Sequence, residues 1–426
     1  MLPFSIFDLL QMSGLNVKNV LEFGKYLGRE LETLKAGNYG EKYRTGMRLL
    51  AKERETVTKF LYEKYRSTES DSTTSVFISY MGGSGYTPRK LPLVSRDELL
   101  RTNNPSLKIK SHYAGEKKTA PLGQKELAQE MAKWQAANLH LYDGSIYSLD
   151  TIEKTVDIGF KETSFWKYRA TLGSLPDELA IALVDHGVEK LRKAPLPRRQ
   201  KYMGSILSLF SFHERICAGG VNVLFAAKTK NNDLALILQR RSFAVSDEPG
   251  SLTVVPKAFH EPMVSPSKEH NPIDTIYREC YEELFGGDEQ QSKRHISSKY
   301  YLTRCPGVGE LVSGKSKNHK LIPLGINWDL LRGNYMLNYC LFVDDPNWWE
   351  KYQHDIQVNW EVDETAEPAT MISETNQLHN LINRQDWAPE AYFTFIEGLR
   401  WLVNHSAPAK KIKRLLPDLI LTPATK

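Results

Sequence analysis

Two apolar runs separated by a polar turn constrain the fold of this 426-residue chain more than any other feature. The runs are residues 221–227 and 234–239, and the turn between them, residues 230–233, carries a lysine, two asparagines and an aspartate. Short apolar runs on both sides of a polar turn predict a β-hairpin, and their continuous apolar character predicts that both strands are largely buried. We therefore expect a sheet in the C-terminal half.

The remaining periodicity predicts an α+β fold preceded by a mainly helical N-terminal region. After residue 200 we expect a strand at 251–255, a helix from about 272 to 285, strands near Tyr300 and at 339–343, and a last helix at 389–404. Before it, helical spacing dominates 7–66, 124–140 and 150–193, with one short strand at 76–80. A polar linker at 67–75 and prolines at 195 and 197 then divide the chain into a helical segment 1–66, a mainly helical middle region 76–200 and a domain 201–426.

Composition excludes several classes of protein. Hydrophobic residues make up 41% and charged residues 25%, which excludes overall disorder, and the sequence contains no apolar run near 18 residues that would span a membrane. The N-terminus lacks the basic start of a secretory signal, so we expect a cytoplasmic protein with four reduced cysteines. A formal charge of +5 is too small to indicate nucleic acid, but it suits an anionic small molecule.

The helix expected at 272–285 carries the most informative pattern. At about 100° per residue, an apolar stripe forms on one side, while Glu279, Glu282 and Glu283 converge on the other. Three carboxylates on one helix face repel each other unless a divalent cation or a basic partner neutralises them. Mg²⁺, or Mn²⁺ in its place, prefers such hard oxygen ligands, so the sequence predicts a metal site at these three residues.

The run Arg278-Glu279-Cys280-Tyr281-Glu282-Glu283 resembles the core of the Nudix box, and the order of strands around it is similar to that of long bacterial Nudix proteins over about residues 205–405. The resemblance implies a Nudix-like sandwich of mixed sheet and helices. It also implies that Glu279, Glu282 and Glu283 bind the metal, that Arg278 orients a carboxylate, and that Glu283 acts as a base. The implied reaction is magnesium-dependent attack of water on a nucleoside diphosphate linked to another moiety.

The loop that precedes the helix departs from the box. His270 and Val264 stand where the box has Glu and Gly, the closing glycine comes one residue late at Gly286, and Lys257 follows Pro256 where typical members have glycine. Two alternatives therefore stay open. The chain either binds a nucleotide or phosphorylated ligand as a regulatory protein without hydrolysis, or it reuses the fold in a biosynthetic reaction. In a hydrolase the helical half is expected to shape the pocket or to form a homodimer, and in a regulatory protein it is expected to transmit the signal.

Other candidate residues are interpreted more simply. His213 and His260 each stand beside a glutamate, a pattern more typical of local hydrogen bonding than of a ligand site. Glu310 follows two glycines in an expected loop, where it offers an alternative base. The glycines at 82–85 lack the Gly-Lys-Ser/Thr ending of a phosphate loop, and the basic residues at 410–414 are expected to form a solvated tail.

Overall fold

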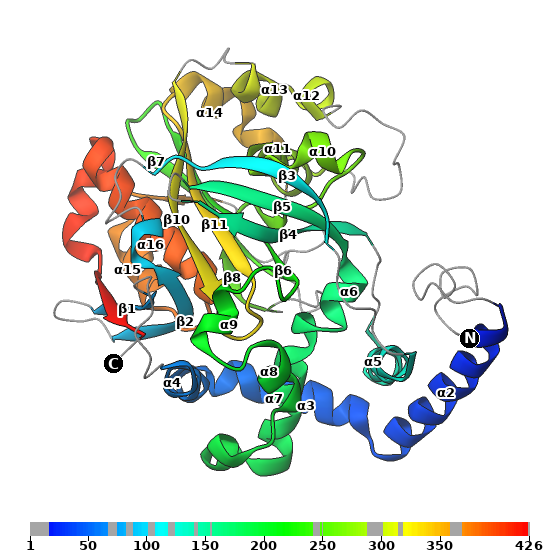
Figure 1. The fold of residues 1–426 in the computed structure, drawn as a ribbon. Helices are drawn as coiled ribbons and strands as arrows, with labels where there is room; N and C mark the ends of the chain where they lie inside the picture. The colour runs from blue at the N-terminus through cyan, green and yellow to red at the C-terminus, as the bar shows by residue number, and fades with distance from the viewer. Residues whose placement is uncertain are drawn as a thin grey trace.

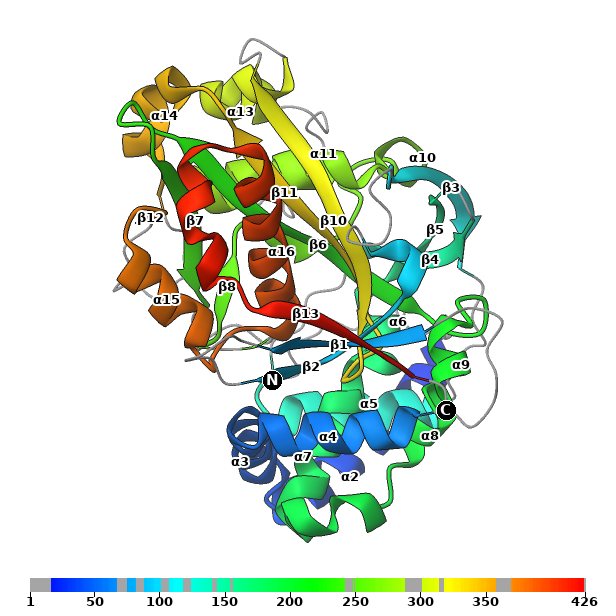
Figure 2. The same cartoon turned by 90° about the vertical axis from the view of Figure 1, so that its left-hand side faces the viewer.

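A computed structural model describes residues 17–66, 75–81, 88–100, 107–117, 124–139, 144–153, 156–241, 248, 250–287, 301–313, 318–357 and 369–424. The chain forms a long mixed sheet with helices on both faces and a helical group at one end (Figures 1 and 2). The expected α+β class is confirmed. None of the helices in the described ranges is long and apolar enough to span a membrane.

The helices of the first half are α2 Val17–Ala36, α3 Tyr39–Lys52, α4 Arg54–Tyr65, α5 Gln124–Ala136, α6 Phe165–Arg169, α7 Leu175–His186, α8 Pro197–Tyr202 and α9 Ile206–Phe210. Those of the second half are α10 Pro266–Glu269, α11 Pro272–Glu279, α12 Tyr301–Arg304, α13 Pro306–Val312, α14 Pro346–Tyr352, α15 Thr375–Asn383 and α16 Pro389–His405. A π-helical turn, Cys280–Leu284, extends α11, and 3₁₀ turns lie at Asp97–Leu99, Leu172–Ser174, Val188–Lys193, Gln353–Asp355 and Pro408–Leu415.

The strands are β1 Ser75–Met81, β2 Arg89–Arg96, β3 Lys110–Glu116, β4 Ser145–Ile152, β5 Asp157–Ser164, β6 Cys217–Lys228, β7 Leu234–Arg240, β8 Leu252–Val254, β9 Lys257–Phe259, β10 His319–Asp329, β11 Tyr335–Val343, β12 Ala369–Met371 and β13 Asp418–Pro423. Nine of these described strands follow one another across the sheet in the order β13-β1-β2-β10-β11-β6-β4-β5-β3. The predicted hairpin is confirmed as β6 and β7, which pair antiparallel.

Strand β6 organises the sheet because it pairs along both edges. Along one edge, residues 219–227 of β6 pair parallel with β11. Along the other edge, β4, β9 and β7 pair antiparallel with successive parts of β6. Gly219 and Gly220 permit this crowding, since a β-carbon at Gly219 would lie 2.0 Å from the Tyr335 carbonyl oxygen and one at Gly220 would lie 1.9 Å from that of Ala258. Any larger residue at these two positions would separate β6 from its neighbours.

Helices cover both faces of β6. Its side chains alternate, so that Val223 and Phe225 join the core beneath α11, while Leu224 and Ala226 join the core beneath α16. Burial on both faces explains the continuous apolar run in the sequence. Helix α11 supplies Ile276 to the first core, and α16 lies across the second, as Figure 2 shows.

The middle region is less helical than its sequence suggests. The helix expected at 124–140 is confirmed as α5. In the stretch 150–193, where helices were expected, the end of β4 and all of β5 are strands, and α6 and α7 follow them as helices. Strand β4 pairs with the start of β6, and β2 pairs with the end of β10. The sheet therefore crosses the domain boundary predicted near residue 200.

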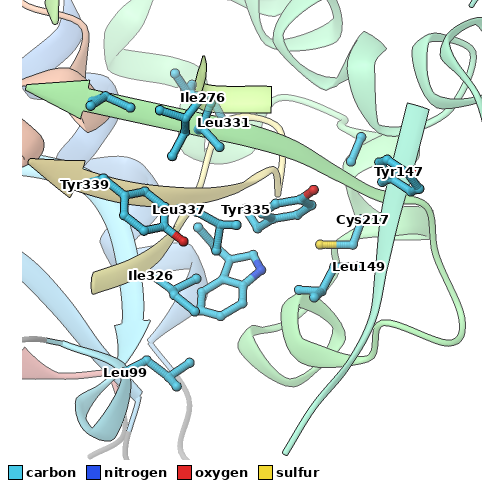
Figure 3. Packing of buried hydrophobic residues seen from close by; sticks show 14 of the residues in the cluster. Leu99, Tyr147, Leu149, Cys217, Ile276, Ile326, Leu331, Tyr335, Leu337 and Tyr339 are labelled. Carbon is cyan, nitrogen blue, oxygen red and sulfur yellow. The ribbon is translucent and has the colours of Figure 1, made fainter. Parts of the chain in front are cut away.

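The hydrophobic core also crosses that boundary. Figure 3 shows Leu99, Tyr147 and Leu149 from the first half of the chain in one cluster with Cys217 and Tyr335 from the second half. The buried guanidinium of Arg199, in α8, adds polar contacts across the boundary, because it donates to the Tyr65 hydroxyl at 3.0 Å and to the carbonyl oxygens of Leu330 and Leu331. No break in packing separates the two halves within the described residues.

Most elements predicted after residue 200 are confirmed at β8, α11, β11 and α16. The strand predicted near Tyr300 begins outside the described residues, and the residues that follow form helix α12 instead. The basic residues among 410–414 are exposed to solvent, as expected. They do not form a tail, because they lie in a 3₁₀ turn that buries Ile412 and leads into strand β13. The glycines at 82–85 and the N-terminal residues before 17 lie outside the described ranges.

Candidate active site

A cavity of about 200 Å³ opens between the end of α11, strand β9 and the turn that joins β10 to β11. Its lining combines charged, polar and apolar groups from the second half of the chain: Gly219, Gly220, Arg241, Lys257, Ala258, Phe259, Glu261, Met263, Glu279, Glu282, Glu283, Asp329, Arg332, Asn334, Met336 and Glu390. Among these described lining residues, six carboxylates stand against three basic side chains. The cavity is therefore acidic overall and suited to a cation or a cation-bound ligand.

All three glutamates of the predicted metal site line this cavity. Glu279 ends α11, and Glu282 and Glu283 belong to the π-helical turn that follows it. Glu279, Glu282 and Glu283 are only 7%, 9% and 5% exposed, respectively. Polar residues so deeply buried require charged or hydrogen-bonding partners, and π-helical turns are frequent at functional sites. The expected convergence of the three residues on one side of the helix is confirmed by the cavity that they share.

Arg278 fixes the orientation of Glu279. Its Nη2 lies 2.6 Å from Glu279 Oε1, and Nε donates to the same oxygen at 3.2 Å. Nη1 donates to the carbonyl oxygen of Glu261, which anchors the guanidinium to the loop after β9. Burial alone would lower the pKa of Arg278, but the carboxylates of Glu279 and Glu261 outweigh it and raise that pKa above its usual value. Arg278 is thus a fixed cation behind the site.

Glu283 is held from the sheet side. Its Oε2 accepts a hydrogen bond from the backbone N–H of Lys257 at 3.0 Å. Lys257 is the first residue of β9, whose pairing with β6 fixes the position of that N–H. This contact links the end of the helix to the strand across the base of the cavity.

The opposite wall is the turn between β10 and β11. Asp329 accepts hydrogen bonds from the backbone N–H groups of Leu331 and Arg332, at 2.8 and 3.2 Å, and its Oδ2 lies 3.4 Å from Arg332 Nη1. Asn334 donates through Nδ2 to the hydroxyl of Tyr168 in α6 at 2.8 Å. The helical half of the chain thus supports this wall from behind, although the described lining residues all lie between 219 and 390.

The loop half of the box is altered in sequence but ordered in structure. Glu269, one residue before the expected position at His270, accepts hydrogen bonds through Oε2 from the backbone N–H groups of Met263 and Val264, at 2.5 and 2.9 Å. The carboxylate holds the loop that leads from β9 to α11. Although His270 replaces the glutamate of the box, the neighbouring Glu269 fixes the conformation of this loop.

The donor types of the three glutamates fit a hard divalent cation, since carboxylate oxygens are the ligands that Mg²⁺ prefers. Their positions do not form a completed site. Within the described ranges, no group of three or more histidine, cysteine, aspartate or glutamate side chains is arranged to hold a metal ion. Arg278 already contacts Glu279 Oε1, and the Lys257 backbone N–H already contacts Glu283 Oε2.

No protein-family model matches this chain, and no curated protein matches it. The Nudix resemblance therefore stays a prediction based on the motif at 278–283 and the strand order around it.

The other candidate residues lie outside the cavity. His213 is largely exposed, with Nδ1 3.3 Å from Asp150 Oδ1. Glu310 was expected on a loop, but it belongs to helix α13 and pairs with Lys351 Nζ at 2.7 Å. The four cysteines are buried free thiols, and burial raises the pKa of Cys280 well above its usual value, which makes it a poor nucleophile.

His260 is a fully buried core residue. Its Nδ1 lies 2.9 Å from Thr275 Oγ1 and its Nε2 lies 3.0 Å from the His270 carbonyl oxygen, so both ring nitrogens have partners other than the adjacent glutamate. Tyr147 packs over the ring at a centroid distance of 4.4 Å. Burial lowers the pKa of His260 to about 3.

This burial predicts a pH-dependent loss of stability. The unfolded chain binds a proton at the usual histidine pKa of 6.5, whereas the folded chain does not until about pH 3, so stability falls as the pH drops below 6.5. We expect His260→Gln to reduce the slope of unfolding free energy against pH by about 1.4 kcal/mol per pH unit between about pH 6 and 4. Urea unfolding followed by tryptophan fluorescence measures this slope. An unchanged slope in His260→Gln would contradict the prediction.

Several cavity residues were not identified from the sequence. Arg241, Asp329, Arg332 and Glu390 lie 38 or more residues from Glu279 along the chain, and none of them belongs to a motif. Lys257 departs from the box in the sequence, but no sequence pattern indicates that it lines a cavity. One local signal was present for Glu390, since a glutamate in the first turn of a helix after proline is favourably placed near the positive end of the helix dipole.

Proposed function

We propose that the protein is a metal-dependent hydrolase of the Nudix type, acting on a nucleoside diphosphate linked to another moiety. One observation carries the proposal: the three glutamates of the Arg-Glu-x-x-Glu-Glu motif line the same cavity as two arginines, Arg241 and Arg332. Carboxylates that hold a divalent cation beside guanidinium groups that bind phosphate oxygens are the combination that phosphoanhydride cleavage requires.

Each group in the cavity has a role in this proposal. Glu279, Glu282 and Glu283 would hold the cation, and Arg278 would keep Glu279 in place. When bound, Mg²⁺ or Mn²⁺ would neutralise charge on the phosphate oxygens and lower the pKa of a water molecule. Glu283 would accept the proton of the attacking water, by analogy with the resembling family.

The phosphate and base of the substrate would contact different parts of the wall. Arg241 and Arg332 line the cavity and would bind phosphate oxygens through their guanidinium groups. Phe259, Met263 and Met336 supply an apolar surface in the same cavity, which suits a flat nucleobase. A phosphorylated product would be released from the diphosphate-linked substrate.

Calorimetric titration of Mg²⁺ and Mn²⁺ tests the metal site. We expect the wild type to bind the cation and Glu282→Gln/Glu283→Gln to lose this binding, because the substitutions remove two charged ligands while keeping the size of the side chains. Glu310→Gln is the matched control, since its carboxylate lies outside the cavity and pairs with Lys351. Equal binding by wild type and the double variant would refute the site.

The incomplete metal arrangement favours one alternative, a ligand-binding or regulatory protein that no longer hydrolyses its ligand. In that case the cavity would bind a nucleotide or phosphorylated molecule without turnover. A panel of nucleotide-linked compounds, assayed for phosphate-bearing products and for thermal stabilisation of the protein, separates the two. If a compound stabilises the protein thermally but no metal-dependent turnover is found, the protein binds its ligand without hydrolysing it, and the hydrolase proposal is wrong.

A further inference from the structure

Tyr168, in helix α6, holds two lining residues of the cavity from behind. Its hydroxyl accepts a hydrogen bond from Asn334 Nδ2 at 2.8 Å. Its ring packs edge-on against the ring of Phe259, with a centroid distance of 5.8 Å. Asn334 and Phe259 line the cavity, whereas Tyr168 is absent from its described lining. Because both residues contact one tyrosine, an amide and an aromatic ring lie close together on the same part of the cavity wall.

The ring of Phe259 is supported on one side and accessible on another. A second aromatic residue of α6, Phe165, packs edge-on against it at a centroid distance of 5.6 Å. Phe259 itself stays partly exposed. Its neighbour across the strand pair is Gly220, which has no side chain to cover the ring and also lines the cavity. A flat ligand therefore has room beside this ring.

The side-chain amide of Asn334 has one polar atom left over. Asn334 is 9% exposed, and its backbone is fixed because its carbonyl oxygen accepts a hydrogen bond from the Asp329 N–H at 2.9 Å. Nδ2 is bonded to Tyr168, but Oδ1 has no hydrogen-bond partner among the described residues. A buried amide oxygen without a partner is costly, and a ligand N–H that bonds to it removes this cost.

A hydrogen-bonding amide beside a partly exposed aromatic ring is suited to a nucleobase. The flat face of a base stacks on an aromatic side chain, and its edge carries N–H groups that donate to an amide oxygen. A sugar or a phosphate group has no flat face to stack on Phe259. The chemistry of this part of the wall therefore favours the base of the proposed substrate over its other parts.

We propose that Asn334 is a specificity-determining residue, which accepts a hydrogen bond from the edge of a nucleobase stacked on Phe259, and that Tyr168 is the positioning residue for both. This inference rests on the proposed function, because it assigns the base of the same substrate. Through Tyr168, the helical half of the chain controls ligand binding without lining the cavity.

Calorimetric titration in the presence of Mg²⁺ compares ADP, GDP, CDP and UDP with inorganic pyrophosphate, which has no base. We expect the wild type to bind at least one of the four nucleotides about fivefold or more tightly than pyrophosphate. Asn334→Leu, which is close in size, should weaken binding of that nucleotide by about two- to tenfold and leave the pyrophosphate affinity unchanged. The proposal is overturned if no nucleotide binds more tightly than pyrophosphate, if Asn334→Leu keeps the nucleotide affinity, or if both affinities fall equally.

A double-mutant cycle tests the positioning role of Tyr168. Tyr168→Phe keeps the aromatic ring and removes the hydroxyl, so it should weaken nucleotide binding by about two- to fivefold and leave the pyrophosphate affinity unchanged. Tyr168→Phe/Asn334→Leu should bind the nucleotide no more weakly than Asn334→Leu alone, because the hydroxyl acts through the amide. Tyr62→Phe is the matched control, since this hydroxyl of the helical half bonds to the carbonyl oxygens of Ile78 and Leu91 instead.

Three outcomes would contradict the role of Tyr168. They are an unchanged nucleotide affinity in Tyr168→Phe, an equal loss in Tyr62→Phe, and additive losses in the double variant. Because Tyr168→Phe is a conservative substitution, it also tests the proposal if Asn334→Leu folds poorly.

Failure of the proposed hydrolase function has a different signature. If nucleotide binding depends on Asn334 and Tyr168 but no compound shows metal-dependent turnover, the assignment of the base is correct and the hydrolase proposal is wrong. If metal-dependent turnover is found and is insensitive to Asn334→Leu and Tyr168→Phe, the hydrolase proposal stands and the assignment of the base is wrong.

Discussion

Replacement of Glu283 by glutamine is expected to lower kcat for metal-dependent hydrolysis by about 10²–10⁴-fold, the range typical of a missing general base. The substitution removes the proton acceptor and one charge at the predicted metal site. It keeps an oxygen that accepts the hydrogen bond from the Lys257 backbone N–H, so the fold should survive. Rates of phosphate release from the substrate identified in the compound panel, measured at saturating Mg²⁺, provide the test.

The matched control for this experiment is Glu310→Gln. The Glu310 carboxylate pairs with Lys351 on the surface of α13 and is absent from the described cavity lining, so its loss should leave kcat unchanged. If Glu310→Gln lowers kcat as much as Glu283→Gln does, the base has been assigned to the wrong carboxylate. If Glu283→Gln retains wild-type kcat while its circular dichroism matches the wild type, Glu283 does not act as the base.

A fragment that begins at Lys193 is expected to be insoluble or molten, and the full chain is expected to unfold in a single transition. The fragment lacks β4 and β2, which pair with β6 and β10, and it lacks the buried side chains that these strands and α4 add to the shared core. Each fully buried large apolar side chain contributes about 1.5–3 kcal/mol, so the loss of even five exceeds the net stability of many domains, about 5–15 kcal/mol. From the sequence, a domain beginning at about residue 201 was predicted to be separable. The structure leads to the opposite expectation, because the sheet continues across that position.

Calorimetry and near-ultraviolet circular dichroism of the fragment measure the outcome. As a control, the fragment can be refolded together with residues 1–192, which should restore a cooperative transition because the missing strands are supplied in trans. A fragment that unfolds cooperatively by itself would instead establish the boundary predicted from the prolines at 195 and 197.

Elements with a strong local pattern were predictable from the sequence. Strands β6 and β7 have continuous apolar runs around a polar turn, and α11 and α16 have clear helical spacing, so their side-chain order alone indicates the structure. The sequence predicts helices from residue 150, and this prediction is wrong for the end of β4 and for β5, whose short apolar runs are interrupted by charged residues. Their strand conformation depends on pairing with each other, and β4 also pairs with the distant strand β6.

The same distinction between local pattern and long-range packing applies to the candidate site. Helix periodicity by itself determined that Glu279, Glu282 and Glu283 share one side of α11 and its π-helical extension, because neighbours on a helix are fixed by local geometry. Only the tertiary structure decided what faces them. Lys257, Arg332 and Glu390 reach the cavity because β9, the turn before β11 and the start of α16 meet there, and long-range packing of this kind leaves no periodic trace in the sequence.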